Sequence, residues 1–161
     1  MGDFAVKGKL YALFLGICLL APIFALAQRA HGTLGESIDS IEADRNVLSA
    51  VRHAATGRKG YTVEEVESDS SIVREYVSQS GVVFGIAWNG LVHPELMQLL
   101  GSYYGEYYEA LQKTPHKAGR KRLQVKTDRV VVEKWGHMRN LQGRAYAPAL
   151  IPSGVSVDEI R

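Results

Sequence analysis

The chain has a single cysteine, Cys18, and it lies inside an apolar run near the N-terminus. Without a second thiol the chain forms no intramolecular disulfide, which excludes a disulfide-stapled secreted scaffold. The fold must therefore be stabilised by packing, and the roughly 130 residues beyond the apolar run suffice for one ordinary core. The sequence predicts a single domain without covalent cross-links.

Motifs that bind nucleotides or support acyl transfer are also missing. The sequence contains no G-x-x-x-x-G-K-[ST], no G-x-G-x-x-G and no G-x-S-x-G, so it indicates neither a phosphate-binding loop nor a serine nucleophile. The five histidines are scattered and lack the His/Glu spacing that places metal ligands on one helix face. We therefore expect no metal and no cofactor, and we identify no catalytic residue from a motif.

The chain has little excess charge of either sign. Its 19 basic and 17 acidic residues give a net charge of +2, which argues against binding nucleic acid as the global design. Basic residues do gather around one stretch with Pro and Gly, which is either a solvated surface loop or a loop that attracts anions. They are Lys113, Lys117, Arg120, Lys121, Arg122 and Lys126.

The first 27 residues have the three-part layout of a secretory signal. Lys7 and Lys9 precede a stretch without charged residues over 10–27, and Ala25 and Ala27 form an A-x-A cleavage motif. Cleavage after Ala27 would remove Cys18 and lower the net charge to +1. The sequence thus predicts a periplasmic or secreted protein that has no membrane contact after cleavage.

Two alternatives to a cleaved signal remain. An uncleaved membrane anchor needs about 20 apolar residues, and the run over 10–27 falls only a little short of that length. A lipoprotein signal fits less well, because Ile17 precedes Cys18 where a small residue is usual.

After the signal, residues 28–36 carry two glycines and little apolar periodicity, which is typical of a flexible lead-in segment. Residues 37–150 form the predicted domain, and residues 151–161 form a C-terminal tail with Pro152 and Gly154. An apolar stripe with helical spacing runs through residues 38–55. Ser37 suits the N-cap of this predicted helix, and Gly57 suits its end.

The remaining pattern alternates between strands and one long helix. Strands are predicted over 61–66, 72–77 and 82–88, a helix starts at Pro94, and further strands follow over 123–126, 129–135 and 141–147. In the third strand, Val82, Phe84, Ile86 and Trp88 are predicted to form one core layer, with Gly85 and Ala87 on the other face. The fold class is therefore α+β, with an N-terminal helix, a three-stranded antiparallel meander, a long helix and two or three further antiparallel strands.

Two groups of residues are candidates for a binding surface. On the long helix, Tyr104 and Tyr108 lie beside the leucine stripe and could form an exposed aromatic face. In the last strand, a bulge at Gly143 would bring Arg144 and Tyr146 onto the same side as His137 and Arg139, which would create a cationic and aromatic strip. The alternative is structural: Arg139 or Arg144 pairs with Glu75 or Glu133, and Tyr146 caps the core.

Several motifs in order resemble a proteobacterial family known as domain of unknown function 2844. The resemblance rests on residues 73–77, on Gly81, Trp88 and Gly90, on residues 94–96 and 99–101, and on residues 136–139 and 143–146, with Asp44 and Arg45 as a weaker match. Trp135 departs from the family pattern, which favours a small residue there. The resemblance implies a small exported protein without an assigned activity, and no catalytic residues can be transferred from it.

Two classes of function remain open at the level of the sequence. The favoured one is a periplasmic or secreted binding module whose partner is an envelope protein or a polysaccharide. The alternative is a small hydrolase or transferase that uses His137 with a carboxylate, either Glu75 or Asp128. The second class requires residues distant in sequence to meet in a cleft.

Overall fold

The computed structural model describes residues 33–47, 51–53, 55–115, 119 and 121–161. The predicted signal sequence, its cleavage site and the first part of the predicted lead-in segment lie outside these residues. Among the helices that are described, none has the length and apolar character needed to cross a membrane.

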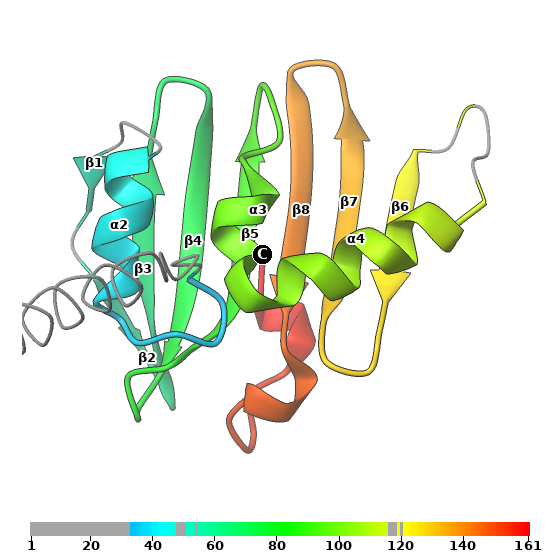
Figure 1. Cartoon of the computed structure of the whole chain (residues 1–161). Helices are drawn as coiled ribbons and strands as arrows, with labels where there is room; N and C mark the ends of the chain where they lie inside the picture. Colours follow the sequence, from blue (N-terminus) through cyan, green and yellow to red (C-terminus); the bar gives the residue numbers. More distant parts are fainter. Residues whose placement is uncertain (1–32, 48–50, 54, 116–118, 120) are drawn as a thin grey trace, which may run out of the picture.

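One antiparallel sheet of eight strands organises the described part of the chain (Figure 1). The strand order is β1-β3-β4-β5-β8-β7-β6, and β2 also pairs with β3. Because β8 pairs with β5, the two halves of the chain join at the centre of the sheet. The strands are β1 (Val51–Arg52), β2 (Thr56–Arg58), β3 (Tyr61–Glu67), β4 (Ser71–Ser78), β5 (Val83–Gly90), β6 (Arg122–Lys126), β7 (Val131–His137) and β8 (Asn140–Tyr146).

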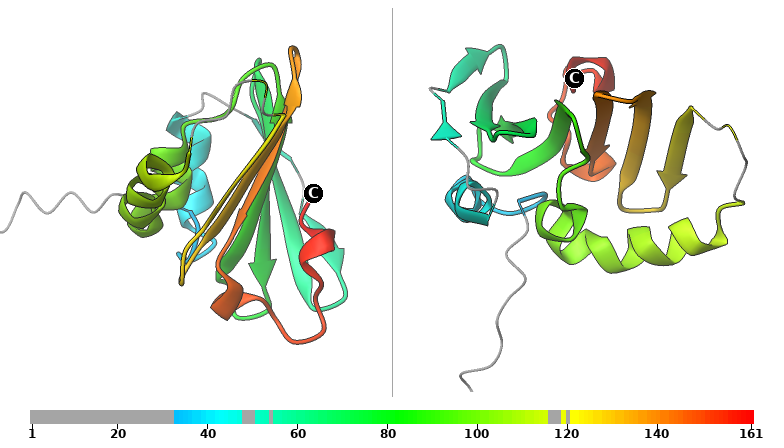
Figure 2. Two further views of the ribbon diagram at one scale, coloured as in Figure 1. Left: turned by 90° about the vertical axis from the view of Figure 1, so that its right-hand side faces the viewer. Right: turned by 90° about the horizontal axis from the view of Figure 1, so that it is seen from above.

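The described α-helices, with the 3-10 turn between two of them, cover one face of this sheet (Figure 2). They are α2 (Ser40–Val47), α3 (Leu96–Leu100), the short 3-10 helix η2 (Gly101–Tyr103) and α4 (Tyr104–Lys113). The C-terminal segment, with 3-10 helices η3 (Pro148–Leu150) and η4 (Val157–Glu159), lies on the opposite face. We call the first side the helix face and the opposite side the second face.

The predicted fold class is wrong in two respects. The long helix predicted over 38–55 is wrong: only the eight-residue α2 forms within the described part of this range, and Val51 and Arg52 pair with Glu67 and Val66 as β1. The three-stranded meander and the later strands are not separate sets, because together with β1 and β2 they form one sheet. Apolar spacing is a local signal, whereas pairing with a strand more than ten residues away is decided by tertiary contacts.

The long helix predicted from Pro94 is interrupted at Gly101. This glycine has φ of +48° and caps α3, and the chain continues through one 3-10 turn before α4 begins at Tyr104. Glycine adopts this backbone conformation at little steric cost, which explains the change of direction at this position. The break lets α3 pack over β5 while α4 extends across β8, β7 and β6 (Figure 1).

A register shift in β5 changes which of its side chains share a face. Tyr76 pairs with Gly85 while Val77 pairs with Val83, so Phe84 is an extra residue. Ile86 and Trp88 therefore pack under the helices, whereas Phe84 and Ala87 pack on the second face. The single layer predicted from simple alternation is wrong for Phe84, because a bulge reverses the alternation.

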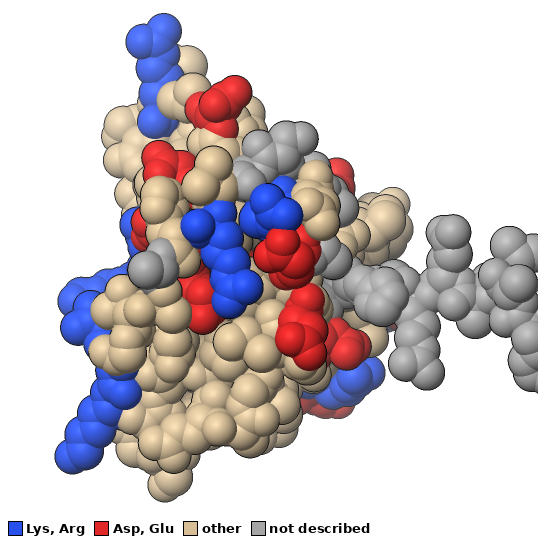
Figure 3. All heavy atoms as spheres, turned by 90° about the vertical axis from the view of Figure 1, so that its left-hand side faces the viewer, with Lys and Arg blue, Asp and Glu red and all other residues tan. Residues whose placement is uncertain are grey.

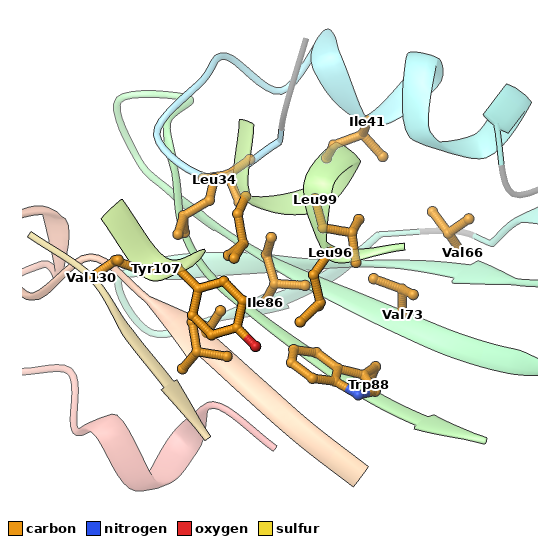
Figure 4. Close-up of a cluster of buried hydrophobic side chains, with 14 of the residues drawn as sticks. Leu34, Ile41, Val66, Val73, Ile86, Trp88, Leu96, Leu99, Tyr107 and Val130 are labelled. Atoms are coloured by element: carbon orange, nitrogen blue, oxygen red, sulfur yellow. The ribbon is translucent and has the colours of Figure 1, made fainter. Parts of the chain in front are cut away.

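The main core lies between the sheet and the helices (Figure 4). Trp88 is buried against Gly143 of β8, and its indole Nε1 donates to Nδ1 of His93 at 2.9 Å. Burial lowers the pKa of His93, so the imidazole is kept as the neutral acceptor that this bond requires. Leu34, from the lead-in segment, is also fully buried, and its amide donates to the carbonyl of Leu99.

Candidate functional site

The C-terminal segment covers one part of the second face and leaves the rest open. Ile160 is fully buried there, against Gly85 and within a cluster that includes Tyr61, Tyr76 and Phe84. The Tyr76 hydroxyl donates to the Arg161 carbonyl at 2.7 Å and accepts from the Arg161 amide at 2.9 Å. The predicted tail over 151–161 is thus packed on the sheet through its last residues.

A capped turn fixes the chain just before Ile160. Ser156 and Glu159 form a capping box at η4, and the Glu159 carboxylate also accepts from the Tyr61 hydroxyl at 2.9 Å. The hydrogen bond from the Ser156 amide, together with that from Tyr61, lowers the pKa of Glu159. Burial raises the pKa of both Tyr61 and Tyr76, so both hydroxyls stay protonated and can donate at neutral pH.

The first cavity opens where the C-terminal segment meets β2, β3 and β4. Its volume is about 410 Å³, and its walls carry more polar than apolar surface. Figure 3, seen from the β1 edge, shows Lys and Arg side chains projecting from the left outline, which is the side away from the helices. The lining residues are His53, Thr56, Arg58, Tyr61, Val63, Glu65, Arg74, Tyr76, Glu159 and Arg161.

A second cavity, of about 160 Å³, lies further across the same face, towards β7. It shares Arg74 and Arg161 with the first cavity, so the two cavities adjoin, and we call them together the second-face groove. From β3 to β7 the groove crosses four strand spacings, or about 19 Å. The second cavity is lined by Arg74, Trp88, Asn89, Trp135, Asn140, Gln142, Gly143 and Arg161.

Strand register explains why these polar residues share one face. Arg74 lies opposite Glu65 and Ala87, while Asn89 lies opposite Gln142, which in turn lies opposite Trp135. Alternate residues of each strand point to the same face, so two cross-strand rows of side chains form the groove floor. Pairing across six strands therefore assembles the groove.

Hydrogen bonds hold the groove side chains in place. Arg74 Nε lies 2.9 Å from Glu65 Oε2, and Arg74 Nη1 donates to Asn89 Oδ1 at 2.8 Å. Trp135 Nε1 donates to Gln142 Oε1 at 3.0 Å, and Gln142 Nε2 donates to Asn140 Oδ1 at 2.8 Å. These contacts fix the orientation of the arginine, the indole and the amides before any ligand arrives.

The side chains that line the groove include three arginines and two glutamates, so cationic side chains outnumber anionic ones. Among the described residues, neither Arg58 nor Arg161 has a carboxylate within ion-pair distance. Of the two carboxylates in the lining, Glu65 is paired with Arg74, and Glu159 accepts from Tyr61 and Ser156. The groove is therefore suited to a ligand that presents negative charge.

Two predicted candidates, Arg144 and Tyr146, lie on the second face next to the groove but support the C-terminal segment. Arg144 Nε contacts Glu133 Oε2 at 2.5 Å, and Arg144 Nη1 donates to the carbonyl of Val157 at 2.8 Å. The Arg144 side chain is only 14% exposed, and Tyr146 packs against the Ile160 cluster. The ion pair between Arg144 and Glu133 matches the alternative in which Arg144 has a structural role and does not contact a partner.

His137 and Arg139 belong to the hairpin between β7 and β8. His137 pairs with Asn140, so Met138 and Arg139 form a two-residue turn, in which Arg139 has φ of +67°. The β7–β8 register runs unbroken through Gly143, so the predicted bulge is absent. Arg144 therefore lies on the opposite side of β8 from Leu141, while His137, opposite Asn140, lies on the same face as Arg144 at the far end of the hairpin.

Neither carboxylate proposed for the hydrolase lies beside His137. The register aligns Glu75 with Ile86, Ala145 and then Val132, which places it about 16 Å along the strand direction from His137. Asp128 precedes the other end of β7. Within the described residues there is also no group of three or more His, Cys, Asp or Glu side chains able to hold a metal.

Tyr104 and Tyr108 stack on each other on α4, with ring centroids 6.0 Å apart. Tyr108 is 48% exposed, while Tyr104 also packs against the main core. These two residues lie on the helix face and therefore on the other side of the sheet from the groove.

Sequence reasoning missed most of the groove residues. Arg74 lies two residues before Tyr76, and Gln142 lies two residues before Arg144. Because alternate residues of a strand point to the same face, this spacing alone could have placed each pair on one face. No local signal indicates that β4 and β8 both pair with β5. Trp135 stood out only as a departure from the family pattern.

The comparison with protein families gives one match, and it covers residues 30–160. No curated protein and no solved structure matches the chain. The match spans nearly all of the folded part, including every strand of the sheet, and it confirms the resemblance drawn from the motifs. The chain belongs to the family described as protein of unknown function (DUF2844).

Proposed function

We propose that this chain is an exported binding module without catalytic activity and that the second-face groove is its binding site. One observation carries the proposal: two adjoining cavities that share Arg74 and Arg161 form a polar groove with fixed side chains and with more arginines than glutamates in its lining. Binding sites are typically concave and few in number, with a small set of well-placed polar groups. The partner is an envelope component that presents negative charge.

The chemistry of the groove favours binding over catalysis. Its side chains are mainly arginine, tyrosine, tryptophan and amides, which recognise ligands through contact area and directed hydrogen bonds. The histidine in the lining, His53, is bonded to Glu67 at 2.9 Å at the outer edge of the first cavity. The alternative, a hydrolase or transferase that uses His137, is less well supported, because neither Glu75 nor Asp128 lies beside His137.

The proposal that the chain is exported is supported by the three-part signal over residues 1–27. We expect intact-mass measurement of protein from the envelope fraction to give a chain that begins at Gln28. A full-length species that stays with membranes after a carbonate wash would contradict cleavage and favour the anchor.

Two neighbouring residues provide a matched test of the groove. Arg58 lines the first cavity, whereas the adjacent Lys59, with the same charge, does not. In co-sedimentation with purified envelope material, Arg58→Ala is expected to reduce the bound fraction several-fold, because it removes a cation from the groove wall. Lys59→Ala is expected to bind like the wild type. Equal loss in both variants would mean that net charge, and not the groove, governs binding.

A further inference from the structure

We infer that the ligand of the second-face groove is an acidic polysaccharide, an extended chain of sugar rings that carry carboxylates. This inference rests on the proposed function, because it names the ligand class of the same groove. It follows from three features of the groove. These are the arginines at one end, the amide and indole side chains at the other end, and the strand backbone beneath them, whose hydrogen bonds are already made within the sheet.

The end of the groove near β2 and β3 is suited to carboxylates. Arg58 and Arg161 line it without an ion-pair partner among the described residues, and Arg74 is already oriented by Glu65 and Asn89. Guanidinium groups bind carboxylates through paired, charge-assisted hydrogen bonds. Two arginines on different elements would allow successive acidic groups of one polymer to be bound.

The end near β7 is suited to sugar rings. The indole of Trp135 is held by Gln142 and has Arg122 5.6 Å from its ring centre. Asn140 and Asn89 use their carbonyl oxygens within the protein, and their amide nitrogens have no acceptor among the described residues. An amphipathic ring beside spare amide donors matches a sugar, which has C–H faces and hydroxyl acceptors.

The backbone beneath the groove favours a polysaccharide over a peptide. The strands β3, β4, β5, β8 and β7 each pair with neighbours on both sides, so their backbone groups are already bonded within the sheet. An extended peptide gains affinity mainly by adding a strand to an open edge. Between β3 and β7 the groove crosses strands that are paired on both sides, so this part offers side chains and no backbone ladder, whereas β2 at its other end pairs, among the described strands, only with β3.

Titration calorimetry with three chemically defined probes tests this inference. Protein purified from the envelope fraction is titrated with hexagalacturonate, with neutral maltohexaose and with the acidic peptide hexaglutamate. We expect hexagalacturonate to bind at least about tenfold more tightly than the other two, because it alone offers both rings and carboxylates.

Variants locate that binding. Trp135→Ala and, as a second groove variant on an exposed strand, Arg58→Ala should each weaken hexagalacturonate binding about tenfold. Tyr108→Ala removes an exposed aromatic ring from the helix face and, like Lys59→Ala, should change affinity less than about twofold.

Each other outcome has a defined consequence. Tighter binding of hexaglutamate with the same sensitivity to the groove variants would overturn the polysaccharide and leave the groove as the site. Equal binding of maltohexaose would overturn the requirement for acidic groups. Sensitivity to Tyr108→Ala alone would overturn both the inference and the proposed site. Failure of all three probes would overturn the ligand class, while envelope co-sedimentation of Arg58→Ala and Lys59→Ala would still decide the proposed function.

Discussion

Replacing Ile160 by Ala is expected to lower the free energy of unfolding by about 3 kcal/mol, within the range for large-to-small changes in a core. Ile160 is fully buried, and its side chain fills the space above Gly85. The change removes apolar contacts at the point where the C-terminal segment is held by the Tyr76 hydroxyl. Urea unfolding of the wild type and the variant measures the effect.

The control for this prediction is Asp158→Ala, two residues earlier in the same segment. The Asp158 side chain is 93% exposed and lies 3.9 Å from Arg144, so its loss should change the free energy of unfolding by less than about 0.5 kcal/mol. Equal stability of Ile160→Ala and the wild type would contradict a packed C-terminal segment and remove one wall of the groove.

Gly143→Ala is expected to destabilise the protein by about 3 kcal/mol through overpacking. A Cβ at this position would lie 2.2 Å from Cζ2 of Trp88 and 2.7 Å from the carbonyl oxygen of Glu133. The indole is buried and bonded to His93, and the carbonyl belongs to the neighbouring strand, so neither can move away at low cost.

Gly57→Ala is the matched control, because a Cβ at Gly57 meets no atom within 4 Å. It should change stability by less than about 0.5 kcal/mol. Denaturant unfolding followed by tryptophan fluorescence compares the two variants. A Gly143→Ala protein as stable as Gly57→Ala would contradict the packing of Trp88 on β8 and thus the β5–β8 pairing.

The sequence predicted the individual strands better than their assembly. The alternation around Tyr61, Ile72 and Leu141 is a local signal, and strands are present at each of these positions. The helix predicted over 38–55 failed because Val51 lies in a strand whose partner, Glu67, is distant in sequence. The bulge at Phe84 was also missed, because Gly85 beside it was placed by simple alternation on the face opposite Phe84.

The groove could not be predicted for the same physical reason. Asn89, Gln142 and Trp135 meet only because β8 pairs with β5 on one side and with β7 on the other. The wall formed by Arg161 depends in addition on the burial of Ile160. These are non-local contacts, whereas the candidates chosen from sequence were clustered along one helix or one hairpin.

The most direct test of the binding groove is a chemical-shift map of the isotope-labelled protein with soluble polysaccharide and peptide fractions of the envelope. We predict that the largest changes occur at the side-chain amides of Asn89 and Gln142 and at the indole N–H of Trp135, with none at Tyr108. Changes confined to α4, or to the β7–β8 turn at His137 and Arg139, would contradict the groove as the binding site.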